Sequence, residues 1–349
     1  MALHVVIMAG GKGERLWPLS KRDMPKQLIS FDGKKSLLRR TFDRTLQFVQ
    51  EDHIYVVTNK DIADKVGDHL PGMPKENILV EPVGRNTAPC IGYAAMVISA
   101  KDPDATMAVF PSDHIVSDPA NFVEAVGFGT KALERYPELL ITIGMIPDHP
   151  ETGYGYIAPG GVIIKNQGHV LHKVDTFHEK PDKISAEAYI ENGFLWNAGM
   201  FLWRVDTILE RLEQYLPELF NGLVKIRSPY GIDHSALNDF YVNTLPISID
   251  YGIMEKADSV AVIPVEFGWN DIGSWDAIGK MLPKDEKGNV IKGSVLMEDS
   301  CNNVVWSTNK KIVLIDVRDL VVVEGEDAIL ICTRERSQDV SKAAKLVAG

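Results

Sequence analysis

The segment His4-Val-Val-Ile-Met-Ala-Gly-Gly-Lys-Gly-Glu-Arg-Leu-Trp-Pro-Leu-Ser20 leads from an apolar run into a glycine-rich, basic loop. The apolar residues Val5–Met8 are typical of a strand that is buried on both faces. Gly10, Gly11 and Gly13 lack a Cβ, so the backbone can turn tightly and bring its N–H groups close to phosphate oxygens. The segment therefore predicts a strand followed by a loop that holds a nucleoside triphosphate.

Basic side chains accompany these glycines. Lys12 and Arg15 lie in the loop itself, and Lys26 follows in the segment Met24-Pro-Lys-Gln27. Arg15 can bind phosphate oxygens bidentately, whereas Lys26 supplies a compact point charge. The alternative interpretation is a simple glycine turn with incidental surface charge.

Several familiar motifs do not fit the chain. A Walker loop needs the spacing Gly-x4-Gly-Lys-Ser/Thr, which does not occur. A dinucleotide fingerprint needs a third glycine after Gly11-Lys-Gly13, but Leu16 stands at that position. The chain also has no His-Glu-x-x-His zinc motif and no Gly-x-Ser-x-Gly elbow of a serine hydrolase.

Composition narrows the class of protein. The chain has 349 residues, of which 45% are hydrophobic and 24% charged, as in ordinary globular proteins with one large α/β domain and a smaller one. Its net charge of -11 argues against nucleic acids and anionic membranes as partners, because both favour basic surfaces. An anionic ligand remains compatible with positive charge that is concentrated in the first loop.

The cysteines and the apolar segments indicate a soluble, cytoplasmic protein. Cys90, Cys301 and Cys332 are far apart and form no Cys-x-x-Cys pair, so they predict neither a zinc site nor a disulfide framework. The apolar run Val5–Ala9 is too short for a signal peptide, and no stretch approaches the roughly 20 apolar residues of a membrane span.

The first half of the chain alternates between strand and helix patterns. This alternation predicts a mainly parallel sheet with helices on both faces. The expected strands are Val5–Met8, Ile54–Thr58, Ile78–Val80, Thr106–Phe110 and Leu139–Gly144. The expected helices are the one capped by Ser36, then Asp61–Leu70, Thr87–Ala100 and Ala120–Tyr136.

The later part of the chain has a different pattern. After Ile146 the expected strands are longer and antiparallel, as in Lys173–Glu179 and Gly199–Trp203. From Gly288 to Cys332, short β runs alternate with Gly, Asn and Asp, which predicts a β-solenoid or small sheet, followed by a helix over Ser337–Val347. We expect a catalytic domain over residues 1–284 and a solenoid domain over residues 285–349.

Polar residues follow the predicted strands, where ligands bind in open α/β sheets. Asp113 follows one buried strand, and Asp271 lies in the segment Phe267–Trp275. Mg²⁺ prefers oxygen ligands and often takes one or two carboxylates together with phosphate, so the two residues predict a magnesium site if the fold brings them together. Their alternative role is helix capping.

Other residues have the chemistry of a carbohydrate site. Glu179 can accept hydrogen bonds from sugar hydroxyls, and Lys180 can neutralise a phosphate. Asn197, with the nearby Gly199, and the Tyr154-Gly155 turn offer an amide, an aromatic ring and close backbone approach. The alternatives are a solvated ion pair and ordinary turns.

Taken together, these segments resemble the bacterial mannose-1-phosphate guanylyltransferases of the sugar-nucleotide pyrophosphorylase superfamily. The matching motifs follow the family order across most of the chain. They are Ala9-Gly-Gly-x-Gly-x-Arg-Leu-Trp-Pro-Leu-Ser20, Pro25-Lys-Gln27, Glu81-Pro-Val-Gly-Arg-Asn-Thr-Ala-Pro89, Pro111-Ser-Asp-His114, Phe177-x-Glu-Lys-Pro181, Trp196-Asn-Ala-Gly-Met200, Ser248-Ile-Asp-Tyr-Gly-Ile-Met-Glu-Lys256 and Gly268-Trp-Asn-Asp-Ile-Gly-Ser-Trp275.

The resemblance implies an α/β fold with a Rossmann-like nucleotidyltransferase domain on a mixed, mainly parallel sheet, and a small C-terminal left-handed β-helix-like domain. It implies GMP transfer from GTP to mannose 1-phosphate with Mg²⁺ as cofactor. The implied nucleotide-binding residues are Gly10, Gly11, Lys12, Gly13, Arg15, Glu81, Gly84, Arg85, Asn86, Thr87, Ser112 and Asp113. The implied sugar-phosphate residues are Tyr154, Gly155, Glu179, Lys180 and Asn197. The implied catalytic residues are Arg15, Lys26 and Lys180, and the implied metal ligands are Asp113 and Asp271.

The chain departs from the family pattern at two positions. Many relatives have Thr where this chain has Glu14, and Val where it has His178. Neither change removes an implied ligand. Longer relatives also carry a phosphomannose isomerase domain, which we do not expect within these 349 residues.

Three questions stay open at the level of sequence. Another sugar 1-phosphate or nucleotide would use the same phosphate-binding residues. A non-catalytic sensor of GDP-mannose is the alternative from another class, but it is disfavoured because Arg15, Lys26 and both aspartates are present. The apolar solenoid strands fit either a homodimer surface or packing on the catalytic domain.

Overall fold

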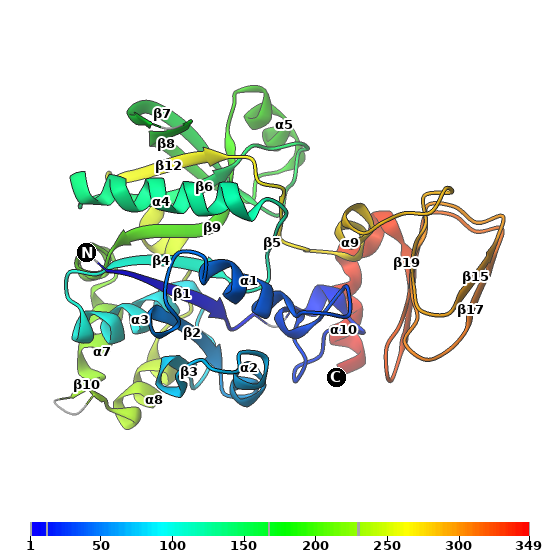
Figure 1. Cartoon of the computed structure of the whole chain (residues 1–349), viewed down its shortest axis with the longest axis horizontal. Helices are drawn as coiled ribbons and strands as arrows, with labels where there is room; N and C mark the ends of the chain where they lie inside the picture. Colours follow the sequence, from blue (N-terminus) through cyan, green and yellow to red (C-terminus); the bar gives the residue numbers. More distant parts are fainter. Residues whose placement is uncertain (1, 12, 167, 229–230, 349) are drawn as a thin grey trace. The chain divides into compact units, whose positions relative to one another are not determined.

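The structure is a computed structural model that describes residues 2–11, 13–166, 168–228 and 231–348 (Figure 1). The chain divides into two compact units. The first, here called the sheet unit, comprises Met1–Gly10, Thr41–Ser112 and Val116–Trp269. The second, here called the solenoid unit, comprises Gly11–Arg40, Asp113–Ile115 and Asn270–Gly349. Most of the predicted triphosphate loop therefore groups with the C-terminal part of the chain. The domain boundary at residue 285 stays a prediction.

Among the described residues, the sheet unit forms one mixed sheet of nine strands. The predicted α/β class is confirmed. In spatial order, the strands are β3 (Ile78–Glu81), β2 (Ile54–Asn59), β1 (Leu3–Ala9), β4 (Thr106–Pro111), β9 (Leu195–Arg204), β6 (Leu140–Met145), β12 (Val260–Val265), β8 (His169–Glu179) and β7 (Gly155–Asn166). Strands β1 to β4 pair in parallel, as do β6 and β12. Within the described residues of this sheet, every antiparallel pair includes β7, β8 or β9.

Helices cover both faces of this sheet, which explains the continuous apolar strands. On β4, Val109 packs with the cluster around helix α3, whereas the next residue, Phe110, has its ring 5.1 Å from Phe122 of α4. Successive residues of a strand point to opposite faces, so α3 and α4 lie on opposite sides. Figure 1 shows α4 running along one face.

Side chains cap the beginning of several helices, and the predicted cap Ser36 is one of them. Ser36 Oγ accepts a hydrogen bond from Arg39 N, and Asp118 Oδ1 accepts from Ala120 N and Asn121 N. The helices associated with the sheet are α1 (Leu37–Thr45), α2 (Ala63–His69), α3 (Thr87–Lys101), α4 (Pro119–Arg135), α5 (Lys183–Glu191), α6 (Val205–Tyr215), α7 (Pro217–Lys225) and α8 (His234–Asn243). Shorter elements are β5 (Ile115–Val116), β10 (Arg227–Ser228), β11 (Gly231–Ile232), β13 (Trp269–Asn270), the 3-10 turns Glu51–His53 and Lys75–Asn77, and the π-helix Asp250–Met254.

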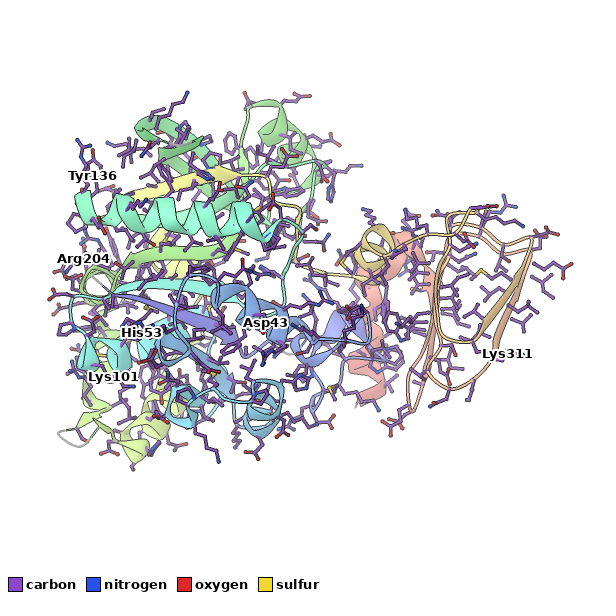
Figure 2. All side chains as sticks on the ribbon, viewed as in Figure 1. Asp43, His53, Lys101, Tyr136, Arg204 and Lys311 are labelled. Carbon is purple, nitrogen blue, oxygen red and sulfur yellow. The ribbon has the colours of Figure 1, made fainter. Side chains whose placement is uncertain are left out.

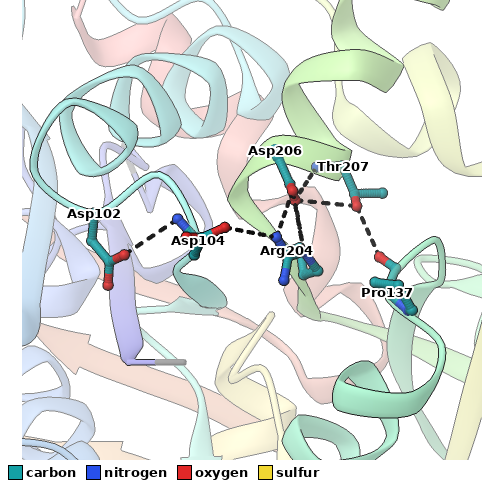
Figure 3. Close-up of polar contacts among 6 residues, drawn as sticks. All are labelled: Asp102, Asp104, Pro137, Arg204, Asp206 and Thr207. Carbon is teal, nitrogen blue, oxygen red and sulfur yellow. Dashed lines mark hydrogen bonds and ion pairs between the residues drawn. The ribbon is translucent and has the colours of Figure 1, made fainter.

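A polar network joins the segments at the beginning of β4 and β6 to the end of β9 (Figure 3). The Arg204 guanidinium contacts Asp206 Oδ2 at 2.6 Å and Asp104 Oδ1 at 3.4 Å. Thr207 Oγ1 donates to the Pro137 carbonyl at 2.8 Å. Arg204 and Tyr136 are labelled in Figure 2 at the end of the unit where β1 begins. This network therefore lies away from the carboxyl ends of β1 and β4, and its role is structural.

The solenoid unit contains stacked β coils, as predicted. The strands are β14 (Val290–Lys292), β15 (Val295–Glu298), β16 (Val304–Trp306), β17 (Ile312–Ile315), β18 (Leu320–Glu324) and β19 (Ile329–Thr333). Strands β14, β16 and β18 pair in parallel register, β15 pairs in parallel with β17, and β19 runs antiparallel to β18. Parallel stacking of successive coils is the geometry of a β-helix-like domain. The predicted left-handedness stays a prediction.

Buried polar side chains complete the backbone hydrogen bonds at the corners of the coils. Asn289 Oδ1 accepts from Asn303 N at 2.9 Å, and Asn303 Oδ1 accepts from Leu320 N at 2.9 Å. Glu324 Oε2 accepts from the backbone N–H groups of Thr308, Asn309 and Lys310. These side chains supply hydrogen-bond acceptors for backbone N–H groups that would otherwise have no partner in the turns of the solenoid.

One apolar cluster connects the coils to the N-terminal segment. It includes Leu16, Trp275 of α9 (Trp275–Met281), Val304 and Val340 of α10 (Val340–Ala348). Trp275 Nε1 also donates to the Trp17 carbonyl at 3.0 Å. The cluster therefore packs the 3-10 turn Glu14–Leu16 against α10, and it includes Ile29, which follows the 3-10 turn Lys26–Leu28. The 3-10 turn Arg334–Asp339 leads into α10.

The helices in the described part of the chain differ in length or in hydropathy from a membrane-spanning helix. None of them is both long enough and apolar enough to span a bilayer.

We expect Glu324→Gln to destabilise the solenoid unit. Hydrogen bonds from the Lys310, Asn309 and Thr308 backbone lower the pKa of Glu324 from 4.5 to about 2, so its contribution to stability is present above pH 4.5 and is lost as the pH falls toward 2. The side-chain amide of glutamine would place its own N–H donors opposite the backbone N–H groups that donate to the carboxylate in the wild type. The urea midpoint of the variant should be lower than that of wild type at about pH 7, and the difference should shrink at about pH 3.

The matched control is Glu298→Gln, because Glu298 is exposed on β15. Equal midpoints for all three proteins at neutral pH would show that the Glu324 carboxylate does not hold the turn.

Candidate active site

The predicted site residues fall into two sets, one in each unit. The triphosphate and metal residues Gly13, Arg15, Lys26, Asp113 and Asp271 belong to the solenoid unit. The residues expected to bind the base and the sugar belong to the sheet unit. Lys12 lies outside the described residues.

A cavity of about 490 Å³ collects the first set. Its size is in the range of small-molecule sites. The lining residues are Gly13, Arg15, Leu16, Lys26, Asp113, Asp271, Ile272, Gly273, Ser341 and Lys345. The structure therefore brings together a loop near the N-terminus, Asp113 in the segment that follows β4, the segment before α9 and two residues of the C-terminal helix.

Gly13 is the glycine that this loop requires. Its φ is +62°, and a Cβ at this position would lie 2.5 Å from Lys26 Cβ. Ser20 Oγ donates to the Gly13 carbonyl at 2.6 Å, and Gln27 Nε2 donates to the Gly11 carbonyl at 3.1 Å. The glycine loop is thus folded closely against the segment that contains Lys26, as the two neighbouring motifs predict.

Lys26 links both aspartates of the cavity. Its side chain is only 9% exposed, its Nζ lies 2.8 Å from Asp113 Oδ2, and Nζ also donates to the Asp271 carbonyl. Burial alone would raise the pKa of Asp113, but the charges of Lys26 and His114 outweigh it and hold this pKa below its ordinary value. Asp113 is therefore ionised near neutral pH.

The turn around Asp271 is held in a strained conformation. Ile272 is fully buried and has a φ of +47°, which is unfavourable for a β-branched residue. Asn270 Oδ1 accepts from Ile272 N at 2.7 Å, and Asp271 Oδ1 accepts from Gly273 N at 3.0 Å. Such strain persists where the surroundings determine the backbone, and here it directs Asp271 to the cavity.

The donor set of this cavity fits a hard divalent cation. Asp113 and Asp271 offer carboxylate oxygens, and Mg²⁺ is commonly held by one or two carboxylates together with substrate phosphates. Among the described residues, no group of three or more His, Cys, Asp or Glu side chains forms a denser metal cluster.

In the sheet unit, Glu81 ends β3 beside Gly10. A Cβ on Gly10 would lie 3.1 Å from Glu81 Oε2. Glu81 is 3% exposed, and its Oε1 has no hydrogen-bond partner among the described residues. Burial raises the pKa of Glu81 to about 7, although a hydrogen bond with Tyr241 opposes this rise. A buried acceptor without a partner is a position where a ligand N–H group would be favourable.

The turn after β3 is tightly fixed. Asn86 has a φ of +71° and caps α3, with its Oδ1 accepting from Thr87 N at 2.8 Å. Thr87 Oγ1 accepts from Ile249 N at 2.8 Å. Arg85 Nε donates to the Tyr241 carbonyl at 2.7 Å, and its terminal nitrogen Nη2 donates to the Val242 carbonyl at 2.8 Å. The Arg85 side chain thus anchors the turn to the end of α8, while Gly84 is exposed.

Ser112 follows β4, and its backbone continues the pairing with β1. Ser112 N donates to the Met8 carbonyl at 3.0 Å, and the side chain is buried. This contact fixes the carboxyl end of β4 beside that of β1.

The predicted sugar residues lie on β7, β8 and β9 or directly beside their ends. Gly155 lies opposite Glu179 in the β7–β8 pairing, and a Cβ on Gly155 would be 3.2 Å from Glu179 Oε1. Lys180 N donates to the Tyr154 carbonyl at 3.2 Å, and Lys180 Nζ lies 3.1 Å from Glu179 Oε2. The Glu179 side chain is 8% exposed and that of Lys180 is 57% exposed, so the carboxylate is enclosed while the ammonium remains open to solvent.

Asn197 is oriented by a residue to which the sequence assigned no role. Its Nδ2 donates to Asp250 Oδ1 at 2.8 Å, and its Oδ1 accepts from Thr142 Oγ1 and Gly199 N, both at 3.2 Å. Burial, and then the charge of Glu179, raise the pKa of Asp250 to about 6. Asp250 lies within the motif Ser248–Lys256, but the sequence alone does not show that it contacts Asn197.

Ser341 and Lys345 also line the phosphate cavity without having been predicted. The helix that carries them was expected over Ser337–Val347, and α10 is observed over Val340–Ala348. No sequence pattern indicates that one face of this helix borders the triphosphate loop.

Comparison with known proteins places this geometry in a family. A family model described as nucleotidyl transferase matches residues 4–288. A second model, described as the MannoseP isomerase/GMP-like beta-helix domain, matches residues 293–345. The predicted fold class, a Rossmann-like nucleotidyltransferase region followed by a β-helix-like region, is therefore confirmed.

Relatives agree with the family models. The chain is 37% identical to mannose-1-phosphate guanylyltransferase of Klebsiella pneumoniae, over 98% of this chain and 73% of the relative. It is 37% identical to alginate biosynthesis protein AlgA of Pseudomonas aeruginosa, over 97% of this chain and 71% of that protein. A crystal structure described as mannose-1-phosphate geranyltransferase from Thermus thermophilus has a TM-score of 0.88, 30% identity and complete coverage of both chains. The chain therefore belongs to the nucleotidyl transferase family, among the mannose-1-phosphate guanylyltransferases.

Proposed function

We propose that this chain transfers GMP from GTP to α-D-mannose 1-phosphate, giving GDP-mannose and pyrophosphate. The observation that carries the proposal is the cavity in which Arg15, Lys26, Asp113 and Asp271 meet, in a chain whose relatives are named mannose-1-phosphate guanylyltransferases. The chain is accordingly an enzyme, and its substrates are a nucleoside triphosphate and a sugar phosphate.

The chemical step needs charge neutralisation more than proton transfer. An oxygen of mannose 1-phosphate attacks the α-phosphorus of GTP, a new P–O bond forms, and the bond to the bridging oxygen breaks with its electron pair going to pyrophosphate. The attacking phosphate is already anionic near neutral pH, so no general base is required. Arg15, Lys26 and Lys180 are proposed to offset the negative charges that gather as the two anions meet.

Asp113 and Asp271 are proposed to hold Mg²⁺. The bound ion would supply electrostatic stabilisation of the phosphate oxygens during displacement. Lys26 contacts Asp113 and the Asp271 backbone, so this side chain positions the proposed metal ligands as well as offering a charge.

The base is proposed to bind at Glu81 and the turn Gly84–Thr87, beside Gly10. Guanine presents N–H donors at N1 and at its amino group, which match a carboxylate acceptor. The Oε1 atom of the buried Glu81, which has no hydrogen-bond partner within the described part of the chain, supports this assignment. Arg85 is proposed to position the turn, since its guanidinium is engaged by backbone carbonyls.

Mannose is proposed to bind at Tyr154, Gly155, Glu179 and Asn197, with Lys180 on its phosphate. The Glu179 carboxylate is enclosed and can accept hydrogen bonds from hydroxyl groups. Asp250 fixes the Asn197 amide, so that its oxygen faces Thr142 and Gly199. A homodimer stays a prediction; the exposed apolar side chains Leu296, Val313 and Ile315 on β15 and β17 would offer a surface for it.

Substrate choice is tested by pyrophosphate release with Mg²⁺. GTP, ATP, UTP, CTP and dTTP are each combined with mannose 1-phosphate and with glucose 1-phosphate. We expect release to be greatest with GTP and mannose 1-phosphate. A maximum with another pair would overturn the base or sugar assignment, and binding of GDP-mannose without any release would indicate a sensor.

We expect Asp271→Asn to lower kcat by roughly 100-fold at limiting Mg²⁺, on the scale of losing one electrostatic group from an active site. Asparagine retains the oxygen that accepts from Gly273 N, so the melting temperature should change little. The control is Asp299→Asn, an exposed solenoid residue with a φ of +47° that asparagine tolerates. Near-full activity of the Asp271 variant at limiting Mg²⁺ would contradict the metal assignment.

Burial of Glu81 predicts a pH-dependent gain in stability for Glu81→Gln. The pKa of Glu81 is raised from 4.5 in the unfolded chain to about 7 in the folded protein. Its contribution to stability is therefore fully present below pH 4.5 and is lost as the pH rises to 7, which lowers the free energy of unfolding by about 3 kcal/mol. Removing the acid should raise the melting temperature at about pH 8 and change it less at about pH 5.

The matched control for this measurement is Glu76→Gln, because Glu76 is exposed in the turn before β3. If the Glu81 variant were less stable than wild type by the same amount at both pH values, its carboxylate would not be held against a desolvation cost.

A further inference from the structure

Helix α10 presents one face to the phosphate cavity. Val340 is buried in the apolar cluster that also contains Leu16, and α10 packs against the turn Glu14–Leu16. Figure 1 shows this helix, in red, beside the dark blue N-terminal segment. Ser341 and Lys345 both line the cavity, as expected for positions i and i+4 of one helix face.

Lys342 provides a contrast on the same helix. Both Lys342 and Lys345 are exposed, but Lys342, whose Nζ lies 2.7 Å from Asp339 Oδ1, is not among the residues that line the cavity. The helix thus carries two lysines that differ in whether they border the phosphate site.

The charges of the cavity favour a polyanion. Among its described lining residues, Arg15, Lys26 and Lys345 are basic, and Asp113 and Asp271 are acidic. Lys26 is paired with Asp113, and a divalent cation on the aspartates would add further positive charge. Basic side chains that converge on one cavity raise the local concentration of anions and stabilise them when bound.

The chemistry of the ligand indicates which phosphates these are. The pyrophosphate portion of GTP carries the densest negative charge of the reactants, and it leaves as a separate polyanion. The residues proposed for the base and the sugar lie in the sheet unit, whereas this cavity contains the glycine loop proposed for the triphosphate. The flexible four-carbon stem of a lysine suits a group that must follow a departing anion.

We infer that Lys345 binds the β- and γ-phosphates of the nucleotide and the pyrophosphate formed from them, with Ser341 beside it on the same helix face. This inference rests on the proposed function. It gives the C-terminal helix a direct part in substrate binding, in addition to its packing role.

The test compares Lys345→Ala and Lys345→Glu with the control Lys342→Ala. KM is measured for GTP and mannose 1-phosphate in the forward direction, and for pyrophosphate and GDP-mannose in reverse. Loss of one charged hydrogen-bond donor should raise KM for pyrophosphate and for GTP about tenfold or more in the alanine variant, and further in the glutamate variant. KM for GDP-mannose, which lacks the β,γ-pyrophosphate, should stay unchanged.

Lys345→Arg should restore most of the affinity for pyrophosphate, because it restores the charge. The control Lys342→Ala should match wild type, and the melting temperatures of the variants should agree. If Lys345→Ala behaved like Lys342→Ala, or raised the KM values of all four substrates equally, the inference would be overturned.

A direct binding measurement separates this inference from the proposed function. Pyrophosphate is titrated calorimetrically into wild type and Lys345→Ala in the presence of Mg²⁺, without turnover. Weaker binding to the variant supports the inference even if no nucleotide and sugar pair releases pyrophosphate, an outcome in which only the proposed function fails. Equal binding by both proteins overturns the inference even if the wild type is fully active.

Discussion

The contacts of the Lys26 ammonium group are the constraint on which the phosphate cavity depends. Lys26 is almost buried, and a buried cation is costly unless it is paired and hydrogen-bonded. The Asp113 carboxylate and the Asp271 carbonyl meet this requirement, and they come from segments far apart in the chain. The same side chain leaves no room for a Cβ at Gly13. The ion pair and the glycine are therefore parts of one arrangement, and a change in either would displace the loop.

This constraint explains why part of the site could be predicted from sequence. Short apolar runs determined the strands, because β1 and β4 are buried on both faces. The cap Ser36 correctly indicated where α1 begins. Asp113 was expected near the glycine loop because both follow strands of a parallel sheet, and the structure shows that β1 and β4 are neighbours. Asp271 was expected there only through the order of motifs, since no local pattern relates it to Lys26.

The rest of the site depends on contacts that no local pattern encodes. Asp250 is recognised as a partner of Asn197 only when the π-helix Asp250–Met254 lies against β9. Lys345 and Lys342 are three residues apart on one amphipathic helix, and their sequence neighbourhoods do not show which of them borders the cavity. The antiparallel strand β7 was not predicted, because its sequence Gly-Tyr-Ile-Ala-Pro-Gly-Gly contains residues that usually interrupt strands. Its pairing with β8 nevertheless positions Gly155 against Glu179.

The pKa values of the proposed site acids are shifted in opposite directions in the two units, and this difference matches their proposed ligands. Asp113 faces Lys26, which keeps its pKa low and leaves an anionic oxygen for a cation. Glu81 and Asp250 have raised pKa values, because burial outweighs the favourable contacts that each one makes. A carboxylate held in this way gains most from a ligand that brings its own N–H or O–H donors. An analogue without those donors would leave the buried oxygen unpaired and would therefore bind more weakly. The buried acids thus favour the correct base or sugar over such analogues.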